Sequence, residues 1–479
     1  MQKQVRLPLL VLFIIHKLQE AGYEAYVVGG AVRDLLLERE VIRDWDVTTN
    51  ATPDEIMPIF DESFYDNAFG TVMVGPEHLL AQMNGEWNSG AEIEEDEYET
   101  FDITTFRSED GYTDNRRPDK VVWGTSLEED VKRRDFTVNA IALKVKGLSE
   151  KLKADAAYDI DVELIDYYGG EKDLDDKVMR AVGDANLRFQ EDALRMMRAI
   201  RIGAQLAFAI EPNTLTAIRD NASLITRISG ERVRDELLKI LASDYPADGV
   251  LLMHSSGLLH FVIPELEEAV EIPQGGHHIY DVWNHMIESL RTCPSRDPIV
   301  RLATLLHDVG KPRTMRRQGP RGVTFYGHEV VGSRMANQIA DRLRLSKKEK
   351  EKLFILVRWH MFAYDTKMTD ASIRRFIRRV GVENINDMMM LRIGDRQGGG
   401  SKATSWRLRE LQQRIGENLY TPLSVKDLKI NGNDVMRELE MEPGPVVGKI
   451  LNQLFEEVME DRLENEVEKL IERAKEMGK

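Results

Sequence analysis

The sequence predicts an α+β domain with a small mixed sheet at the N-terminus, followed by an all-helical remainder. Helix and strand patterns alternate over residues 1–145, and strand patterns end near residue 165. Helical apolar spacing then continues almost to Lys479. At roughly 150 residues per domain, 479 residues leave room for about three domains. We expect four segments, which are 1–150, 151–270, 271–400 and 401–479.

The composition is that of a soluble globular protein and excludes several other classes. With 42% hydrophobic and 31% charged residues, the chain is neither disordered nor collagenous. No apolar run approaches the roughly 18 residues that span a bilayer, so we expect no membrane partner. The net charge of −17 opposes bulk adhesion to nucleic acid, although a local basic stripe would suffice. Cys293 is the single cysteine, which indicates a reducing, cytoplasmic compartment.

The N-terminal elements follow from apolar spacing and from turn residues. Pro8 and the helical spacing of apolar residues up to Leu18 predict a first amphipathic helix. Strands are predicted at 26–28, 45–47 and 101–106, and a helix at 31–40. Between the later strands, residues 84–97 are rich in Gly, Asn and acidic residues, which predicts a solvated loop insertion.

Two glycines follow the strand at 26–28 and open the next helix. Gly29 and Gly30 let backbone N–H groups approach an anion closely, and a helix start favours negative charge. Arg33, one turn later, could reach the same phosphate. On its own, however, this pattern fits a tight turn better than a phosphate site.

Three acidic residues on two predicted strands indicate a metal site. Asp44 and Asp46 are two residues apart, so they share one face of a strand and repel one another unless a cation lies between them. Mg²⁺ suits such oxygen ligands and shares them with phosphates. If the strand bearing Asp102 lies beside them, three carboxylates could hold two metal ions. A solvated strand end is the alternative for the Asp44–Asp46 pair.

A later helical segment combines one acid with three arginines. Asp192, Arg195, Arg198 and Arg201 recur at a spacing of three residues, which predicts a stripe on one helix face. An exposed stripe with a local ion pair is the ordinary interpretation.

In this order, the motifs resemble those of the class II tRNA nucleotidyltransferases, which include CCA-adding enzymes and bacterial poly(A) polymerases. The resemblance is carried by YVVGGAVRD (26–34), DWD (44–46), FDITTFR (101–107), RRDFTVNA (133–140) and EDALR (191–195). It covers residues 20–210, and residues 428–448 are similar to the C-terminal region of members with an HD domain. The family often has glutamate at the position of Asp102. The resemblance implies a polymerase-β-like head, a helical neck, an HD domain and a helical tail that binds tRNA.

The resemblance also implies roles for single residues. Asp44 and Asp46 would bind catalytic Mg²⁺, and Gly30 and Arg33 would hold the triphosphate. Arg134, with its neighbour Asp135, would contact the nucleotide. Asp192 and Arg195 would recognise the base, supported by Arg198 and Arg201.

Base recognition by Asp192 and Arg195 also has a physical basis. Aspartate offers only acceptors and arginine only donors. Cytosine and adenine present an amino donor beside an unprotonated ring nitrogen, whereas uracil and guanine present a carbonyl beside a ring N–H. The pair therefore matches CTP and ATP and mismatches the other two nucleotides at both contacts.

Six of the ten histidines lie between residues 277 and 360, which suggests a second metal site. Their order resembles the HD phosphohydrolase superfamily. By that resemblance, one divalent ion would be bound by His285, His307, Asp308 and Asp395, and His328 and His360 would hold a second ion or a phosphate. Imidazole with carboxylate suits Mn, Ni, Co, Fe or Zn, with Mg also open.

Basic residues in the helical part could contact RNA. Arg374, Arg375, Arg378 and Arg379 predict one positive helix face, and Arg313, Arg316, Arg317 and Arg321 a basic loop. Salt-bridged surfaces are equally compatible with both sets. Residues 452–475 predict one charged amphipathic helix.

The favoured function is template-independent addition of CCA to the tRNA 3′ end from CTP and ATP, and no DNA partner is expected. Within the same class, a poly(A) polymerase or an enzyme that adds only CC or only A stays open. An HD phosphohydrolase whose head recognises tRNA is an alternative from another class, and a non-catalytic tRNA-binding protein is a third.

Overall fold

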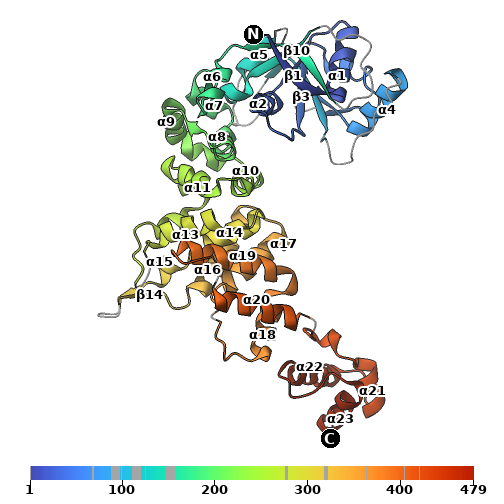
Figure 1. Ribbon diagram of the computed structural model, residues 1–479, viewed down its shortest axis with the longest axis vertical. Helices are drawn as coiled ribbons and strands as arrows, with labels where there is room; N and C mark the ends of the chain where they lie inside the picture. The colour runs from blue at the N-terminus through green and yellow to red at the C-terminus, as the bar shows by residue number, and fades with distance from the viewer. Residues whose placement is uncertain are drawn as a thin grey trace. The chain divides into compact units, whose positions relative to one another are not determined.

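The computed structural model describes residues 2–66, 70–87, 98, 100–110, 120–124, 126–146, 157–275, 279–317, 322–362, 364–403, 405–419 and 421–478. The chain divides into two compact units (Figure 1). Unit 1 comprises Met1–Ile240 and Leu252–Val262, and unit 2 comprises Leu241–Leu251 and Ile263–Lys479.

An eight-stranded mixed sheet forms the centre of unit 1, as the sequence predicts. Its order is β1-β10-β9-β2-β3-β6-β5-β4, and β3 and β6 are its parallel neighbours. The strands are β1 (Gln2–Pro8), β2 (Ala25–Val28), β3 (Trp45–Thr49), β4 (Phe64–Asp66), β5 (Thr71–Val74), β6 (Phe101–Thr105), β9 (Ile141–Val145) and β10 (Ala157–Asp166).

Helices and short ladders complete unit 1. The helices are α1 (Leu9–Glu20), α2 (Gly30–Leu36), α3 (Pro53–Ile56), α4 (Pro76–Trp87), α5 (Leu127–Lys132), α6 (Gly170–Asp175), α7 (Ala185–Glu191), α8 (Leu194–Leu206), α9 (Pro212–Asn221), α10 (Gly230–Ala242) and α12 (Leu258–Val262). The last residues of α10 and the first part of α11 (Pro246–Ser255) belong to unit 2, and the rest of α11 belongs to unit 1. The ladders pair β7 (Arg107–Asp110) with β8 (Lys120–Trp123), and β11 (Val178–Met179) with β12 (Ala209–Ile210).

The structure corrects several expected boundaries in unit 1. Strand β10 pairs with β9 and β1, so the sheet continues past residue 150. Helix α2 ends at Leu36 rather than at residue 40. Helix α4 includes the first residues of the expected loop 84–97, and residues 88–97 lie outside the described part of the chain. The expected first helix is confirmed as α1, and its residues 9–15 are buried on all sides.

Unit 2 is mostly helical. Its helices are α13 (Val282–Thr292), α14 (Pro298–Leu306), α15 (Lys311–Thr314), α16 (His328–Arg342), α17 (Lys347–Trp359), α18 (Asp370–Val380), α19 (Ile385–Gly398), α20 (Trp406–Asn418), α21 (Gly432–Leu439), α22 (Pro445–Met459) and α23 (Val467–Met477). A two-stranded hairpin pairs β13 (Arg316–Arg317) with β14 (Val323–Thr324).

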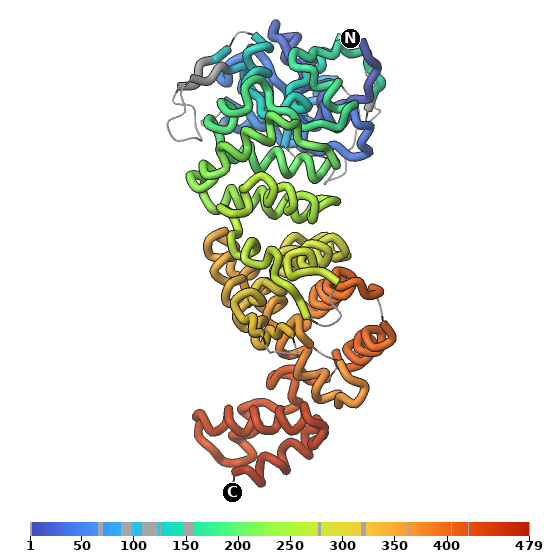
Figure 2. Tube along the Cα trace, turned by 90° about the vertical axis from the view of Figure 1, so that its left-hand side faces the viewer, coloured from blue at the N-terminus to red at the C-terminus, as the bar shows by residue number. Residues whose placement is uncertain are grey.

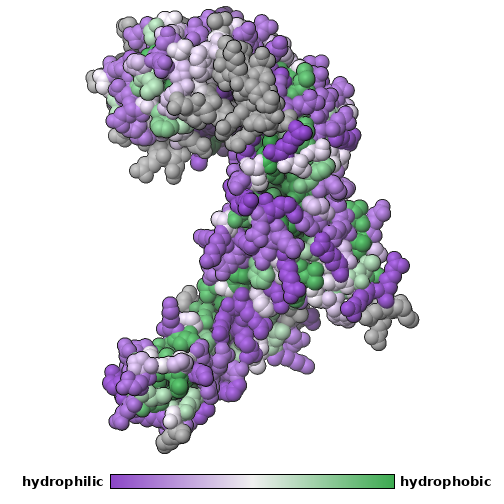
Figure 3. Space-filling view, turned by 180° about the vertical axis from the view of Figure 1, so that it is seen from behind, coloured by the Kyte–Doolittle hydropathy of each residue, from purple (hydrophilic) through white to green (hydrophobic). Residues whose placement is uncertain are grey.

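The C-terminal segment is built differently from the expectation. The single helix expected over 452–475 is two helices, α22 and α23, which pack with α21 at the C-terminal end of the trace (Figure 2). Leu454, Phe455 and Leu470 are fully buried in the core between them. Hydrophobic side chains show between hydrophilic ones at this end of the surface (Figure 3).

The predicted basic helix face is largely engaged in contacts within the protein. Arg374, only 5% exposed, donates to the carbonyl of Met459 and to Asp461. Arg375 pairs with Glu460, and Arg378 pairs with Glu456. These arginines therefore join α18 to the end of α22, which an isolated helix pattern could not show.

Other basic residues differ in their surroundings. Arg379 stacks over Trp359, and Arg313 pairs with Glu268. Arg316 and Arg317 are exposed, while Arg321 lies outside the described residues. RNA contact remains a prediction for both sets, and Arg316 and Arg317 are the exposed members of the loop for which the structure gives no ion pair among the described residues.

Within the described part of the chain, every helix is too short or too polar to cross a membrane. Cys293 is buried and carries a free thiol.

Candidate active site and metal centre

Two of the three predicted carboxylates lie side by side. Asp46 on β3 and Asp102 on β6 are partners in the parallel ladder, so their side chains share one face of the sheet. Both line a cavity of about 360 Å³ in unit 1. Asp44 is exposed and directly precedes β3, and its charge acts on Asp46. The adjacency on which the two-metal prediction depends is therefore confirmed for Asp46 and Asp102.

The surroundings of Asp46 disfavour its negative charge. Burial raises its pKa, and the carboxylates of Asp44 and Asp102 raise it further. Arg134 and Arg198 act in the opposite direction, and the resulting pKa is about 6. A cation beside Asp46 would relieve this repulsion.

Gly29 is required by both conformation and space. Its φ is +81°, in the region that favours glycine. A Cβ atom at this position would lie 2.5 Å from Oδ2 of Asp46 and 3.2 Å from Nη1 of Arg134. The turn after β2 thus brings the backbone against Asp46 and Arg134.

Arg33 is held beside this turn. It makes a two-pronged contact with Asp34, at 2.9 Å for each hydrogen bond, and donates to Oδ1 of Asn139. Its guanidinium lies 3.5 Å from the position of a Cβ on Gly30. Arg33 is thus close to the glycines but lies outside the described lining of the cavity.

Arg133 and Arg134 rest on a buried acid that sequence reasoning missed. Asp130 is fully buried and accepts two hydrogen bonds from Arg133, at 3.0 and 2.7 Å. Arg134 lies 3.6 Å from its other oxygen, and Thr48 donates to the same oxygen. Burial works to raise the pKa of Asp130, but the two arginines hold it below its usual range. Asp130 is only four residues before Arg134, at a helical spacing that could have indicated this contact.

Asp135 and Arg198 form an ion pair at the cavity. Arg198 donates to Oδ2 of Asp135, which is 8% exposed, with nitrogen–oxygen distances of 2.8 and 2.6 Å. Oδ1 of Asp135 accepts from the N–H of Phe136 and from Asn139. Burial opposes ionisation, but Arg198 and these donors hold the pKa of Asp135 far below its usual range.

The arginine stripe on α8 is fully paired. Arg201 contacts Glu236 at 2.8 Å and lies outside the described lining of the cavity. Arg195 donates to Glu191 at 2.7 Å and to the carbonyl of Arg133 at 3.0 Å. Asp192 precedes α8 in an extended turn, which corrects its expected place on the helix.

Asp192 has a partner that the sequence did not indicate. Arg232 on α10 donates to Oδ2 of Asp192 at 2.9 Å. The two residues are forty positions apart, and no local spacing connects them. The cavity lining thus combines predicted and unpredicted residues, and it consists of Asp46, Thr71, Asp102, Thr104, Arg107, Arg133, Arg134, Asp135, Asp192, Leu194, Arg195, Arg198 and Arg232.

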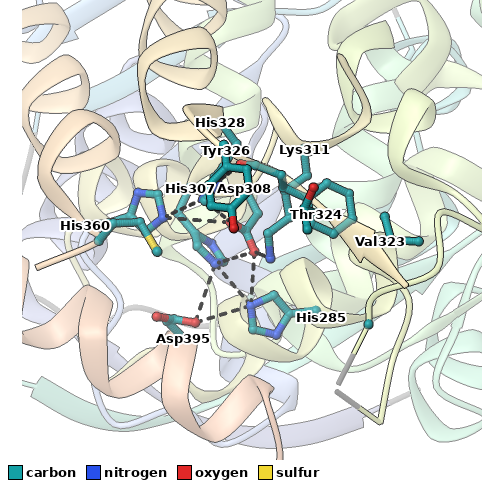
Figure 4. A pocket seen from close by; sticks show the side chains of 13 residues that line it. His285, His307, Asp308, Lys311, Val323, Thr324, Tyr326, His328, His360 and Asp395 are labelled. Carbon is teal, nitrogen blue, oxygen red and sulfur yellow. Dashed lines mark hydrogen bonds and ion pairs between the residues drawn. The ribbon is translucent and has the colours of Figure 1, made fainter. Parts of the chain in front are cut away.

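In unit 2, all six predicted ligands converge on one cavity of about 460 Å³ (Figure 4). Asp308 lies at the centre. Its Oδ2 is 3.4 Å from Nε2 of His285 and 3.2 Å from that of His307, while its Oδ1 is 3.2 Å from Nε2 of His328 and 3.8 Å from that of His360. Asp395 joins the first pair at 3.3 and 3.6 Å.

The histidines are oriented by the backbone. Nδ1 of His307, His328 and His360 lies 2.7 to 2.8 Å from the carbonyls of Thr304, Phe325 and Val357. Nδ1 therefore carries the hydrogen, and Nε2 is left to bind a metal ion. Within the described residues, His285, His307 and Asp395 form one group of ligand spacing, and Asp308, His328 and His360 form another.

The charges of this cavity fit a cation. Burial works against a charged His307, but Asp308 and Asp395 raise its pKa to about 10. Burial and the neighbouring His307 lower the pKa of His360 to about 3. Lys311, one helical turn after Asp308, binds that carboxylate and was not predicted, although its spacing places it on the same side.

Three family models match successive parts of the chain. The poly(A) polymerase head domain matches residues 25–180. "Probable RNA and SrmB-binding site of polymerase A" matches residues 207–270, and tRNA nucleotidyltransferase domain 2 matches residues 333–474.

Curated relatives decide the assignment. The A-adding tRNA nucleotidyltransferase of Deinococcus radiodurans is 37% identical over 340 residues, which are 68% of this chain and 74% of the relative. The chain belongs to the tRNA nucleotidyltransferase family. The CCA-adding enzyme of Geobacillus thermodenitrificans is 42% identical over 258 residues, 54% of this chain and 55% of that enzyme. The match thus spans about half the length of that second relative.

Solved tRNA nucleotidyltransferases extend the similarity over the whole chain. The Bacillus stearothermophilus CCA-adding enzyme in complex with CTP has a TM-score of 0.69 at 27% identity, and the match covers 97% of this chain and 96% of that one. The Thermotoga maritima CCA-adding enzyme complexed with tRNA, at 19% identity and a TM-score of 0.56, covers 99% of this chain and 100% of that one, and shows the shared fold. The expected α+β head with a helical remainder is thereby confirmed as the fold of a tRNA nucleotidyltransferase.

Proposed function

We propose that this enzyme adds C, C and A to the 3′ end of tRNA, using CTP and ATP and no template. The terminal 3′-hydroxyl attacks the α-phosphate, the bond to the β-phosphate breaks, and pyrophosphate leaves. The single observation that supports this most is the ladder pair of Asp46 and Asp102 in a cavity lined by arginines.

The residues present fit Mg²⁺ at this pair. The donors are carboxylate oxygens, and the raised pKa of Asp46 indicates a concentration of negative charge that a hard cation would relieve. Asp44, Asp46 and Asp102 would hold the metal. When bound, divalent ions lower the pKa of the attacking hydroxyl and stabilise the leaving pyrophosphate.

The arginines and glycines bind the nucleotide. Arg134 binds the triphosphate together with Gly30 and Arg33, a role supported by its position in the cavity lining beside Gly29. Asp192 and Arg195 recognise the base, because one offers acceptors and the other donors. Asp135, Arg198 and Arg201 support these groups through ion pairs rather than as separate nucleotide contacts.

Addition of A alone is the second candidate. It is favoured by the 37% identity with the Deinococcus enzyme, whose match covers more of this chain than that of the Geobacillus enzyme. Full CCA addition is favoured by the match over 97% of the chain to the CTP-bound Bacillus structure.

Separate substrates distinguish the two candidates. Labelled CTP and ATP are offered singly and together to tRNA that ends before CCA and to tRNA that ends in CC. A CCA-adding enzyme incorporates CTP on the first and ATP on the second, and stops after A. An A-adding enzyme extends only the second tRNA, and long A tails on either RNA would identify a poly(A) polymerase.

We also propose a metal-dependent phosphohydrolase site in unit 2, formed by the two ligand groups around Asp308. Imidazole with carboxylate suits Mn, Ni, Co, Fe or Zn, with Mg also compatible. A bound ion would activate water against a phosphate ester. We further propose that residues 401–479 contact tRNA, as the match to tRNA nucleotidyltransferase domain 2 favours.

A further inference from the structure

Both residues that would recognise the base are held by groups of the protein itself. Oδ1 of Asp192 accepts from the N–H of Leu194 at 3.0 Å, and Oδ2 accepts from Nη2 of Arg232 at 2.9 Å. Arg195 is fixed by Glu191 and by the carbonyl of Arg133. The orientation of the acceptor and of the donor is therefore set before a nucleotide arrives.

Arg232 reaches this site from outside the sequence motifs. It lies near the start of α10, lines the same cavity as Asp192, and has a partly buried side chain, 28% exposed. Its Nη1 is buried and has no hydrogen-bond partner among the described residues. Because a guanidinium is planar and rigid, the bond through Nη2 also fixes the position of Nη1.

We infer that Arg232 is a positioning residue for base selection, an inference that rests on the proposed function of Asp192. A carboxylate held at one oxygen only can turn about its Cβ–Cγ bond. In a turned position it could accept from the ring N–H of uracil or guanine, which the fixed pair excludes. With Leu194 and Arg232 holding both oxygens, Asp192 presents its acceptors to the amino group of cytosine or adenine.

A purely structural role for the ion pair leads to a different result. If Arg232 only connects α10 to the turn before α8, its loss lowers kcat/KM for every nucleotide by the same factor. If it positions Asp192, its loss changes the ratio between nucleotides. That ratio is kcat/KM for CTP over UTP on tRNA lacking CCA, and for ATP over GTP on tRNA ending in CC.

The test uses Arg232→Met and Arg232→Lys in the full chain. We expect Arg232→Met to lower at least one of these ratios tenfold or more, and Arg232→Lys, which keeps one donor and the charge, to lower it less. Arg234→Met is the matched control, because Arg234 is on the same helix and pairs with Asp235, which is 53% exposed. Melting curves establish whether each variant is folded. If Arg232→Met does not fold, the test is decided by Arg232→Lys alone.

The double variant Asp192→Ala with Arg232→Met separates positioning from other effects. If Arg232 acts through Asp192, this variant has the selectivity of Asp192→Ala alone. Wild-type ratios in both Arg232 variants would overturn the inference, as would an equal loss of selectivity in the Asp192→Ala background. Wild-type ratios in Asp192→Ala itself would instead overturn the proposed role of Asp192, and the inference with it.

Discussion

Asp46 and Asp102 are partners across the parallel strands β3 and β6. Adjacent strands are about 4.8 Å apart, and ladder partners point to the same face, so the two carboxylates lie within reach of one cation. The pair is built by segments more than fifty residues apart in the chain. Its position in the sheet supports a shared metal ion more directly than the local spacing of Asp44 and Asp46.

Removing either charge of this pair should slow nucleotide addition. We expect Asp46→Asn to lower kcat for CTP incorporation by roughly 10³-fold or more, because metal and electrostatic stabilisation of the transition state are lost. Asp102→Asn should lower it by at least tenfold. The control is Asp54→Asn, an exposed acid of the same unit. Activity within threefold of wild type in Asp46→Asn would contradict the metal assignment.

The raised pKa of Asp46 has a measurable effect on stability. The folded form has a pKa of about 6 and the unfolded form about 3.8, so folded protein holds this proton more tightly. The contribution of Asp46 to the free energy of unfolding is therefore least unfavourable below pH 4 and worsens as the pH rises to about 6. In metal-free protein at pH 7.5, Asp46→Asn should be more stable by up to about 3 kcal/mol.

Thermal melting at two pH values checks this expectation. The advantage of Asp46→Asn should shrink between pH 7.5 and pH 5, and excess Mg²⁺ should reduce it at pH 7.5 by stabilising the wild type. An advantage that does not vary with pH would show that the side chain acts through packing instead.

The ion pair of Asp135 and Arg198 should contribute to the stability of unit 1. Asp135→Ala leaves the donors of Phe136, Asn139 and Arg198 without their acceptor, which we expect to cost about 3 kcal/mol after allowance for the exposure of Arg198. Because the pKa of Asp135 is depressed, this stability is present at neutral pH and is lost as the solution is acidified. Urea unfolding of Asp135→Ala, with the exposed Asp159→Ala as control, measures the difference.

The cluster around Asp308 should bind divalent metal independently of nucleotide addition. We expect Asp308→Ala to abolish Co²⁺ or Mn²⁺ binding in unit 2, because Asp308 belongs to one ligand group and its Oδ2 contacts both histidines of the other. Metal content after dialysis, measured on this variant and on the exposed-residue control His260→Ala, checks the expectation. Incorporation of CTP should stay within twofold of wild type. Unchanged metal content in Asp308→Ala would contradict the site.

Arg374 should hold the C-terminal helices in place. Its guanidinium donates twice to the carbonyl of Met459 and once to Asn418, all in a buried setting. Arg374→Met should increase hydrogen exchange in α22 by at least tenfold, while exchange in α8 is unchanged. The neighbouring variant Arg378→Met, which removes a more exposed pair, should have a much smaller effect. Equal exchange in both variants would argue against the buried contact.

The sequence predicts the parts of this site that depend on local spacing. Strands β2, β3 and β6 and the turn at Gly29 are found where the patterns place them. Asp308 and the five other ligands that the resemblance implies line one cavity. Strand β1 was not predicted, because its residues alternate between exposed and partly buried at the sheet edge. Local patterns also could not show what the arginines of α18 contact, since the partners of Arg374 lie more than forty residues away in the sequence.

Within the candidate active-site cavity, the missing information is likewise long-range. Arg232 and Asp192 are joined only by the folded chain, and Asp192 lies in a turn although its spacing suggested a helix. Asp130 is a different case, because its helical spacing from Arg133 and Arg134 could have predicted these contacts. Only its burial could not be predicted from the sequence.

The pairing of nearly every arginine around this cavity has a consequence for how a nucleotide finds it. Six arginines and four aspartates line the cavity, and Asp130 and Glu191 pair with two of these arginines from behind, so positive and negative charges largely cancel a short distance away. Attraction over many ångströms is therefore weak, and capture depends on direct encounter at the cavity mouth. Raising the ionic strength should consequently change the rate of nucleotide association far less than it changes the binding of a polyanion such as tRNA.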